Sequence, residues 1–191
     1  MFRAGRRLRY ATDMSIFPIN DDRDQQRLKS LKTEMLDEPA HFDGKWVSAR
    51  GWIVVPIESA LHFEEDDAEK LSCAFDRIGS SEVFAIATEA LKEFPNYFLV
   101  ATSKQGLLDF SHRCALFNFV LTPGSRSCAV LCTVYDYYLV AGPSEFVRIA
   151  VGGDIDEARR RFDEVAADPW WEGRLARVAD RYRGSSSLAS N

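Results

Sequence analysis

Residues 128–141 read CAVLCTVYDYYLVA, and this stretch decides which kind of fold the chain adopts. From Cys128 to Val134 the side chains are mostly apolar on both sides of an extended chain, because successive residues of a strand point to opposite faces. A strand with two apolar faces lies inside a sheet and is covered by helices on at least one side. We therefore predict a central, buried strand at this position.

Turn signals divide the neighbouring region into further strands. Short segments that contain Gly, two of them also Pro, are expected to form turns at residues 104–106, 123–125 and 142–144. The strands that these turns separate are expected near residues 97–102, 114–121, 128–141 and 145–151. Because the gaps between them are short, we expect the strands to follow one another as an antiparallel meander.

The N-terminal part of the chain predicts a helix and then a strand. Apolar residues recur at helical spacing over residues 21–38, and Pro39 is expected to stop this helix. Residues 46–55 alternate in the way that a half-buried strand requires. Trp46 and Trp52 would then lie on its outward face, which makes that face unusually aromatic.

The remaining elements are a short strand and three helices. We expect the strand at residues 71–75 and a middle helix over residues 81–94, capped by Ser81. Asp154, with Glu157 three residues later, resembles the start of a capped helix. A second C-terminal helix is expected to open at residues 168–169, because Pro is favoured at the first helical position.

These expectations define the fold class and the domain boundaries. The class is α+β: a mainly antiparallel sheet of five or six strands, with an N-terminal helix, a middle helix and two C-terminal helices packed on it. Residues 1–14 are expected to be a disordered basic leader, residues 15–183 a single α+β domain, and residues 184–191 a disordered tail rich in Ser.

Composition excludes several classes of function. The chain has 191 residues, and its 24 Lys and Arg against 29 Asp and Glu give a net charge of -5, which argues against general binding of nucleic acid. No apolar stretch approaches the roughly 20 residues that a membrane crossing requires, so we expect no contact with a membrane. The four cysteines lie mostly in apolar runs and favour reduced thiols in a cytoplasmic protein over a disulfide framework.

The Cys and His residues do not form a recognisable metal or catalytic motif. In a strand, Cys128 and Cys132 would be about 13 Å apart, whereas two thiolates on one zinc ion lie less than about 4 Å apart. His112 and Cys114 would lie on one strand face at about 6.6 Å, which is too far for the hydrogen bond of a nucleophilic pair. We therefore expect buried thiols, no metal, no cofactor and no catalytic residue.

The best functional indication is a cluster of acidic residues. It consists of Glu64, Glu65, Asp66, Asp67 and Glu69 in a segment expected to be a loop or a short helix. A charge run of this kind is usually a solvated surface, but it also suits the docking of a basic partner, whose encounter it would accelerate. Trp46 and Trp52 are candidates for the same surface, because Trp is enriched at binding hot spots, although helices that cover both sheet faces would bury them.

Two functional hypotheses remain open at this point. The first is a cytoplasmic protein-binding module, of an inhibitor or immunity type, that docks a basic protein partner through the acidic residues. The alternative is a small-molecule-binding protein or an enzyme with a pocket at the sheet edge. The candidate reactive groups for that alternative are Asp109, His112, Cys114 and Asp136.

Overall fold

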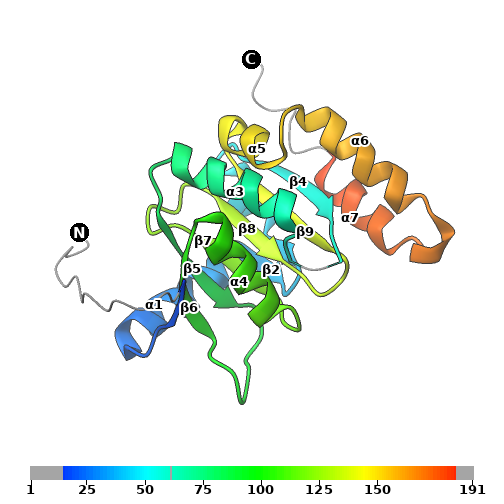
Figure 1. Ribbon diagram of the computed structural model, residues 1–191. Coiled ribbons are helices and arrows are strands. Elements are labelled where there is room, and N and C mark those ends of the chain that lie inside the picture. Colours follow the sequence, from blue (N-terminus) through cyan, green and yellow to red (C-terminus); the bar gives the residue numbers. More distant parts are fainter. Residues whose placement is uncertain (1–14, 61, 184–191) are drawn as a thin grey trace.

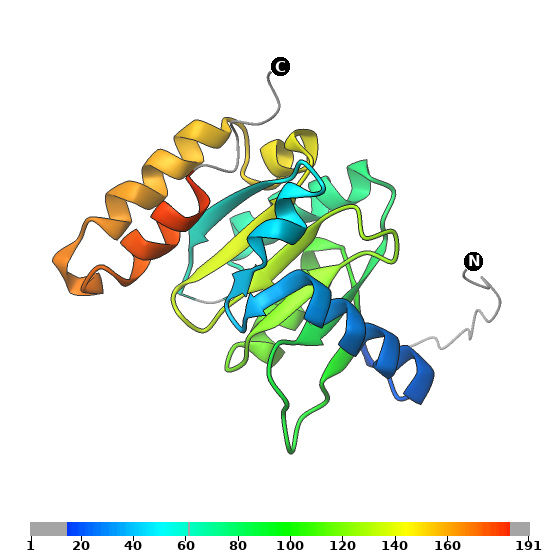
Figure 2. The ribbon, with the colours of Figure 1, turned by 180° about the vertical axis from the view of Figure 1, so that it is seen from behind.

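A computed structural model describes residues 15–60 and 62–183. The expected leader at residues 1–14 and the expected tail at residues 184–191 lie outside the described residues. The described chain forms three layers, a sheet between two layers of helices (Figures 1 and 2). This architecture is α+β with a large antiparallel sheet, as predicted.

Within the described residues, seven strands form the main sheet, rather than the five or six expected, and every neighbouring pair is antiparallel. In sheet order they are β1 (Ile16–Pro18), β6 (Tyr97–Ala101), β5 (Glu82–Ala87), β7 (Phe119–Thr122), β8 (Ala129–Cys132), β9 (Tyr137–Gly142) and β4 (Ile53–Glu58). A small hairpin of β2 (Leu36–Glu38) and β3 (His41–Phe42) lies outside this sheet. The strand expected at residues 128–141 is in fact two strands, β8 and β9, joined by a turn that contains Asp136. Only β7, β8 and β9 follow one another as the expected meander, because β6 pairs with β1 and β5 instead of β7.

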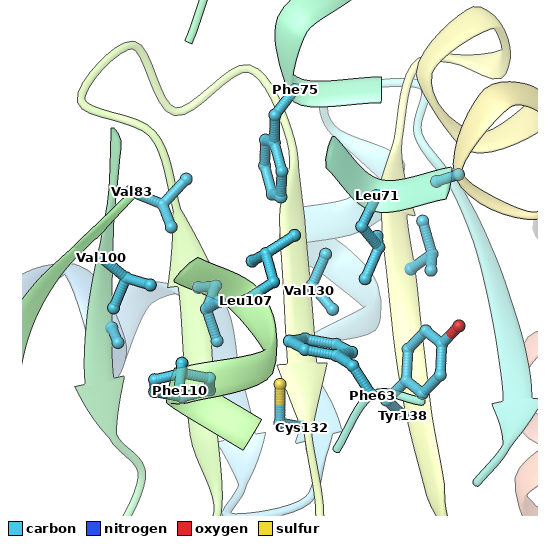
Figure 3. Close-up of a cluster of buried hydrophobic side chains, with 14 of the residues drawn as sticks. Phe63, Leu71, Phe75, Val83, Val100, Leu107, Phe110, Val130, Cys132 and Tyr138 are labelled. Carbon is cyan, nitrogen blue, oxygen red and sulfur yellow. The ribbon is translucent and has the colours of Figure 1, made fainter. Parts of the chain in front are cut away.

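Strand β8 confirms the prediction of a buried interior strand. All four of its residues are buried, and it pairs with β7 on one side and β9 on the other. Val130 and Cys132 point to one face of the sheet (Figure 3), and Ala129 and Leu131 belong to the hydrophobic cluster of the other face. This alternation gives the molecule two hydrophobic cores separated by a single sheet.

Helices cover both faces of the sheet (Figures 1 and 2). One face carries α3 (Glu65–Arg77), α4 (Lys104–Cys114) and α5 (Ser144–Ala150). The other face carries α1 (Asp22–Met35), α2 (Gly44–Ser48) and α7 (Arg174–Tyr182). The helix α6 (Ile155–Ala166) packs along the edge strand β4 and contributes to both cores, through Ala158 on one side and Phe162 on the other.

The expected strand at residues 46–55 is wrong in its first half. Asp43 caps a helical turn there, because its side chain accepts a hydrogen bond of 2.8 Å from the Trp46 backbone amide. That turn forms α2, and the chain then turns through Gly51, with φ of +60°, into β4. The side-chain cap therefore overrides the alternating pattern at Trp46.

The expected elements at residues 71–75 and 81–94 are also wrong. Residues 71–75 lie in α3, whose buried residues Ala68, Leu71 and Phe75 recur at helical spacing. Residues 82–87 form β5 instead of a helix, and they are fixed by antiparallel partners on both sides, β6 and β7. Short apolar runs fit both the helical period of 3.6 residues and the strand period of two residues. Pairing with neighbouring strands therefore decides which of the two structures forms.

The turn expected at residues 104–106 and the strand expected near residues 145–151 are helical. Residues 104–114 form α4, which begins where the Ser103 hydroxyl accepts a hydrogen bond of 3.2 Å from the Gly106 amide, so only the end of the expected strand at 114–121 overlaps β7. Residues 144–150 form α5 rather than a strand. The expected strand near 97–102 is confirmed as β6.

The helices predicted at the two ends of the chain are confirmed. Asp21 caps α1, which ends at Met35, because the chain continues into β2 before it reaches Pro39. Asp154 caps α6 through the amides of Asp156 and Glu157. The second C-terminal helix begins later than expected, because Pro169–Trp171 forms a 3-10 turn before α7.

Candidate functional site

The acidic residues predicted as a docking surface lie at the start of α3. Glu65, Asp66 and Glu69 point into solvent. Lys104 lies 3.7 Å from the Glu65 carboxylate and 3.3 Å from the Glu69 carboxylate, and Lys70 forms an ion pair with Asp66. The outward-facing acids therefore already have cationic neighbours.

Asp67 differs from these three acids because its carboxylate points toward the sheet. The Tyr138 hydroxyl donates a hydrogen bond of 2.9 Å to Asp67 Oδ1, and the Glu64 amide donates one of 3.2 Å to Oδ2. Burial raises the pKa of Asp67 and outweighs these two hydrogen bonds, which lower it. Asp67 therefore combines a structural role at the start of α3 with a carboxylate that is costly to ionise.

A cavity of about 200 Å³ opens beside Asp67 at the edge of the sheet. Its walls come from β4, β9, α3, α5 and α6. The polar lining residues are Glu58, Asp67, Lys70, Tyr138 and Arg161. The apolar lining residues are Ile57, Ala150, Val151, Ala158, Phe162 and Val165. We call this hollow the edge cavity.

Negative charge is concentrated at the edge cavity. Burial raises the pKa of Glu58, and the charges of Glu64, Asp136 and Asp67 raise it further, in that order. We call these four residues, Glu58, Glu64, Asp67 and Asp136, the acidic edge.

The two cations in the cavity wall have acidic partners elsewhere. Lys70 pairs with Asp66, and Arg161 Nε lies 2.9 Å from the Glu157 carboxylate. Neither Glu58 nor Asp67 has an ion pair within the described residues. The edge cavity therefore offers two carboxylates and a phenol that form no ion pair with a described residue, and the charge of Lys70 acts on Asp67 only as a minor influence that lowers its pKa.

The two tryptophans expected at the docking surface lie elsewhere. Trp46 and Trp52 are 8% and 6% exposed, so their expected place on an outward face is wrong. Their rings contact each other edge to face at 4.8 Å, and the Arg50 guanidinium lies 4.0 Å above the Trp46 ring. They belong to the core on the opposite face of the sheet from α3 and are not brought together with the acidic residues.

The reactive groups of the alternative hypothesis are dispersed over α4 and a turn. His112 and Cys114 lie in the last turn of a helix, so the expectation that they share a strand face is wrong. Asp109 accepts hydrogen bonds from Ser15 and from Gln105, the latter at 2.7 Å. Asp136 lies in the turn between β8 and β9, with φ of 64°.

Three of the four cysteines are poor nucleophiles in this environment, whereas Cys73 on α3 is exposed and not buried as expected. Cys114, Cys128 and Cys132 are fully buried. Burial raises the pKa of Cys114 to about 12 and also raises the pKa of Cys128 and Cys132. A thiolate is the reactive form of cysteine, so these three thiols are suited to packing rather than to catalysis.

One buried histidine is not among the predicted site residues. His62 is 1% exposed, its ring lies 5.8 Å from that of Phe110, and its Nε2 lies 3.0 Å from the Cys114 carbonyl oxygen. Because a carbonyl oxygen only accepts, Nε2 is the donor of this bond. Burial lowers the pKa of His62, so it is a neutral member of the core.

Sequence reasoning also missed the role of Tyr138 and the distinction between Asp67 and its neighbours. The signal available was the position of Asp67 at N3 of a helix, where an acid bonds back to the start of the helix. The contact with Tyr138 spans 71 residues of sequence and has no local signal.

Comparisons with known proteins identify no relative of this chain. No family model, no curated protein and no solved structure matches it. Within the described residues, no group of three or more His, Cys, Asp or Glu side chains is placed to hold a metal ion, and no helix is long and apolar enough to cross a membrane.

Proposed function

We propose that this chain is a cytoplasmic recognition protein, of an inhibitor or immunity type, that binds a basic protein partner at the acidic edge. The observation that supports this proposal most directly is that Glu58 and Asp67 line one cavity and that neither forms an ion pair within residues 15–60 and 62–183. Like-charged carboxylates in a partly buried site are unfavourable in the free protein. A cation from a partner would relieve that repulsion.

The dimensions of the edge cavity favour one side chain of the partner. Its volume of about 200 Å³ is smaller than the pockets of about 300–1,000 Å³ that hold drug-sized ligands. A lysine or arginine side chain combines an apolar stem with a charged end. Ile57, Phe162 and Val165 would contact the stem, and Glu58 and Asp67 would accept hydrogen bonds from the charged end.

The exposed acids of α3 would have a different role in this complex. Glu65, Asp66 and Glu69 are solvated and have cationic neighbours, so each contributes little to the affinity. Their field, together with Glu64, would accelerate the approach of a basic surface, and this effect decreases as salt increases. The free state of the cysteines is consistent with a reducing compartment.

A titration with small cations tests the cavity without knowledge of the partner. We expect n-butylammonium and ethylguanidinium to shift the backbone amide resonances of Asp67 and Tyr138 in NMR spectra, and n-butanol to leave them unchanged. The double variant Glu58→Gln, Asp67→Asn should lose the response. The matched variant Glu65→Gln, Glu69→Gln, which removes the same charge from the exposed side of α3, should keep it. Equal shifts with n-butanol, or in both variants, would show that the cavity does not select cations.

Capture of the partner tests the protein-level proposal. Proteins retained from a lysate are identified by mass spectrometry, purified and measured for binding at two salt concentrations. We expect a basic protein whose affinity falls by about tenfold or more in the Glu58→Gln, Asp67→Asn variant and by about twofold or less in the matched variant. A partner that binds all three proteins equally would contradict the proposal.

A small-molecule ligand is the second candidate, because the edge cavity lies at edge strand β4, as that alternative requires. The same two carboxylates would then bind a free amine or guanidine compound. Native mass spectrometry of the purified chain distinguishes the two candidates. A retained small cation would favour the second candidate, and a protein complex would favour the first.

A further inference from the structure

A second hollow lies on the other face of the sheet from the edge cavity. It has a volume of about 800 Å³ and is bounded by α7, by the segment of the β2–β3 hairpin around His41, and by the start of β9. This volume is within the range of about 300–1,000 Å³ of pockets for small molecules. We call this hollow the arginine groove.

Three arginines of α7 form one wall of the groove. Arg174, Arg177 and Arg181 all line it. Residues at i, i+3 and i+7 of a helix fall within about 60° of one another, so the three side chains share one helix face. They extend over about 10 Å along the helix axis.

Two of these arginines have no carboxylate partner in the part of the chain that the structure describes. Arg181 pairs with Asp37, but Arg174 and Arg177 form no ion pair with any described residue. The Arg174 guanidinium lies 5.7 Å from the ring of Trp171. The end of the groove near Arg174 and Arg177 therefore presents two neighbouring guanidinium groups, which suit bidentate binding of a carboxylate or a phosphate.

The acids that line the groove have other neighbours. Asp180 lies 3.2 Å from Arg183, and Glu38 lies 3.8 Å from His41. The charge of Glu89 acts on Lys32, whose ammonium group donates a hydrogen bond of 3.0 Å to the Thr88 carbonyl oxygen. An anion at the Arg174 and Arg177 end would therefore not displace an existing ion pair.

The opposite wall provides hydrogen-bonding and aromatic groups. His41 Nδ1 is buried and has no hydrogen-bond partner among the described residues, and Tyr135 is 45% exposed. The titratable and charged groups that face His41 are Arg181, Glu38 and Asp37. Burial and then the charge of Arg181 lower the pKa of His41, and the two acids only partly compensate. The Tyr135 ring offers a face for a planar group.

We propose that the arginine groove binds a small molecule whose phosphate or carboxylate group contacts Arg174 and Arg177 and whose remaining part lies against His41 and the Tyr135 ring. This site is independent of the acidic edge, because the two hollows have different lining residues. The chain would then combine a cation-selective site on one face of the sheet with an anion-selective site on the other.

Inorganic pyrophosphate and citrate are suitable probes, and calorimetry and thermal unfolding are suitable measurements. We expect saturable binding of at least one of them, with a dissociation constant that rises by about tenfold or more in the Arg174→Gln, Arg177→Gln variant. The matched variant Arg23→Gln, Arg148→Gln removes two exposed arginines outside the groove, and its dissociation constant should change by about twofold or less. Tighter binding of pyrophosphate would assign the anion to a phosphate, and tighter binding of citrate to a carboxylate.

A nuclear magnetic resonance readout makes the test specific to the groove. The bound anion should shift the imidazole resonances of His41 and leave those of His112 on α4 unchanged. Absence of saturable binding with both anions, equal loss in the two double variants, or equal shifts of both histidines would overturn the proposal.

Discussion

The edge cavity and the arginine groove lie on opposite faces of the same strand, and they carry opposite unpaired charges. Tyr138 of β9 lines the cavity, and Tyr137, the residue before it, lines the groove. The cavity has two carboxylates without ion pairs, and the groove has two guanidinium groups without ion pairs, both within the described residues. The comparison shows that a net charge of -5 says little about local selectivity, because side-chain alternation separates the two environments by a single residue.

The largest effect is expected from removing the tyrosine that closes the cavity. Tyr138→Ala should lower the free energy of unfolding by about 3–5 kcal/mol, because the side chain is 1% exposed and packs edge to face against Phe63 at 5.4 Å. Urea denaturation measures this loss. The control Leu116→Ala, at an 83% exposed side chain, should change stability by less than about 0.5 kcal/mol. A loss near that of the control would mean that Tyr138 is not part of the packed wall.

Removing only the hydroxyl groups compares the two consecutive tyrosines directly. Tyr138→Phe should cost about 1.5–3 kcal/mol, because its hydroxyl donates to the Asp67 carboxylate at 2.9 Å. Tyr137→Phe should cost about 0.5–1.5 kcal/mol, because its hydroxyl donates to the neutral Ala40 carbonyl oxygen at 3.3 Å. The same denaturation measurement ranks them. A larger loss of stability in Tyr137→Phe than in Tyr138→Phe would indicate that Asp67 is not charged in the native protein at the pH of the measurement.

The sequence predicts the parts of the fold that depend on local patterns. The two apolar faces of residues 128–134 correctly place β8 inside the sheet, and Asp21 and Asp154 correctly mark two helix starts. Residues 82–87 could not be assigned in this way, because Val83 and Ala87 fit a helical stripe and a strand face equally well. Their structure depends on pairing with β6 and β7, which the local sequence does not encode.

The candidate sites were predictable only in part for the same reason. The acidic run was visible, but the feature that distinguishes Asp67 from Asp66 is a contact with Tyr138, 71 residues away. The arginine groove forms only because α7 lies beside the β2–β3 hairpin, which brings the two ends of the domain together. In this contact the Tyr182 hydroxyl accepts a hydrogen bond of 3.0 Å from the Phe42 amide. Trp46 illustrates the opposite error, in which a residue type associated with interfaces is used for packing.

The smallest effect on stability is expected for a substitution of Glu58 in the edge cavity. This substitution is also the sharpest test of the difference in charge between the edge cavity and the arginine groove. Burial and the neighbouring acids raise the pKa of Glu58 in the native state, so the native state retains this proton to higher pH than the unfolded chain does. The carboxylate therefore opposes folding increasingly as pH rises from the unfolded pKa, about 4.3, through the native one. Glu58→Gln removes this cost, and near neutral pH it should raise the melting temperature by about 1–2 °C, a small value because the side chain is largely solvated.

Thermal unfolding as a function of pH checks both the sign and the origin of this effect. The stabilisation by Glu58→Gln should disappear as pH falls below the unfolded pKa, because both proteins are then neutral at this position. Glu65→Gln, at an exposed acid 3.7 Å from Lys104, should give no such pH-dependent gain. If Glu58→Gln stabilised the chain and still bound the cationic probes as tightly as the wild type, the neighbouring acids would repel Glu58 but Glu58 would not contribute to cation binding. If Glu58→Gln weakened the binding of the cationic probes, Glu58 would both lower the stability of the free protein and recognise the cation. A loss of stability at the residue that binds the ligand is expected of a functional site.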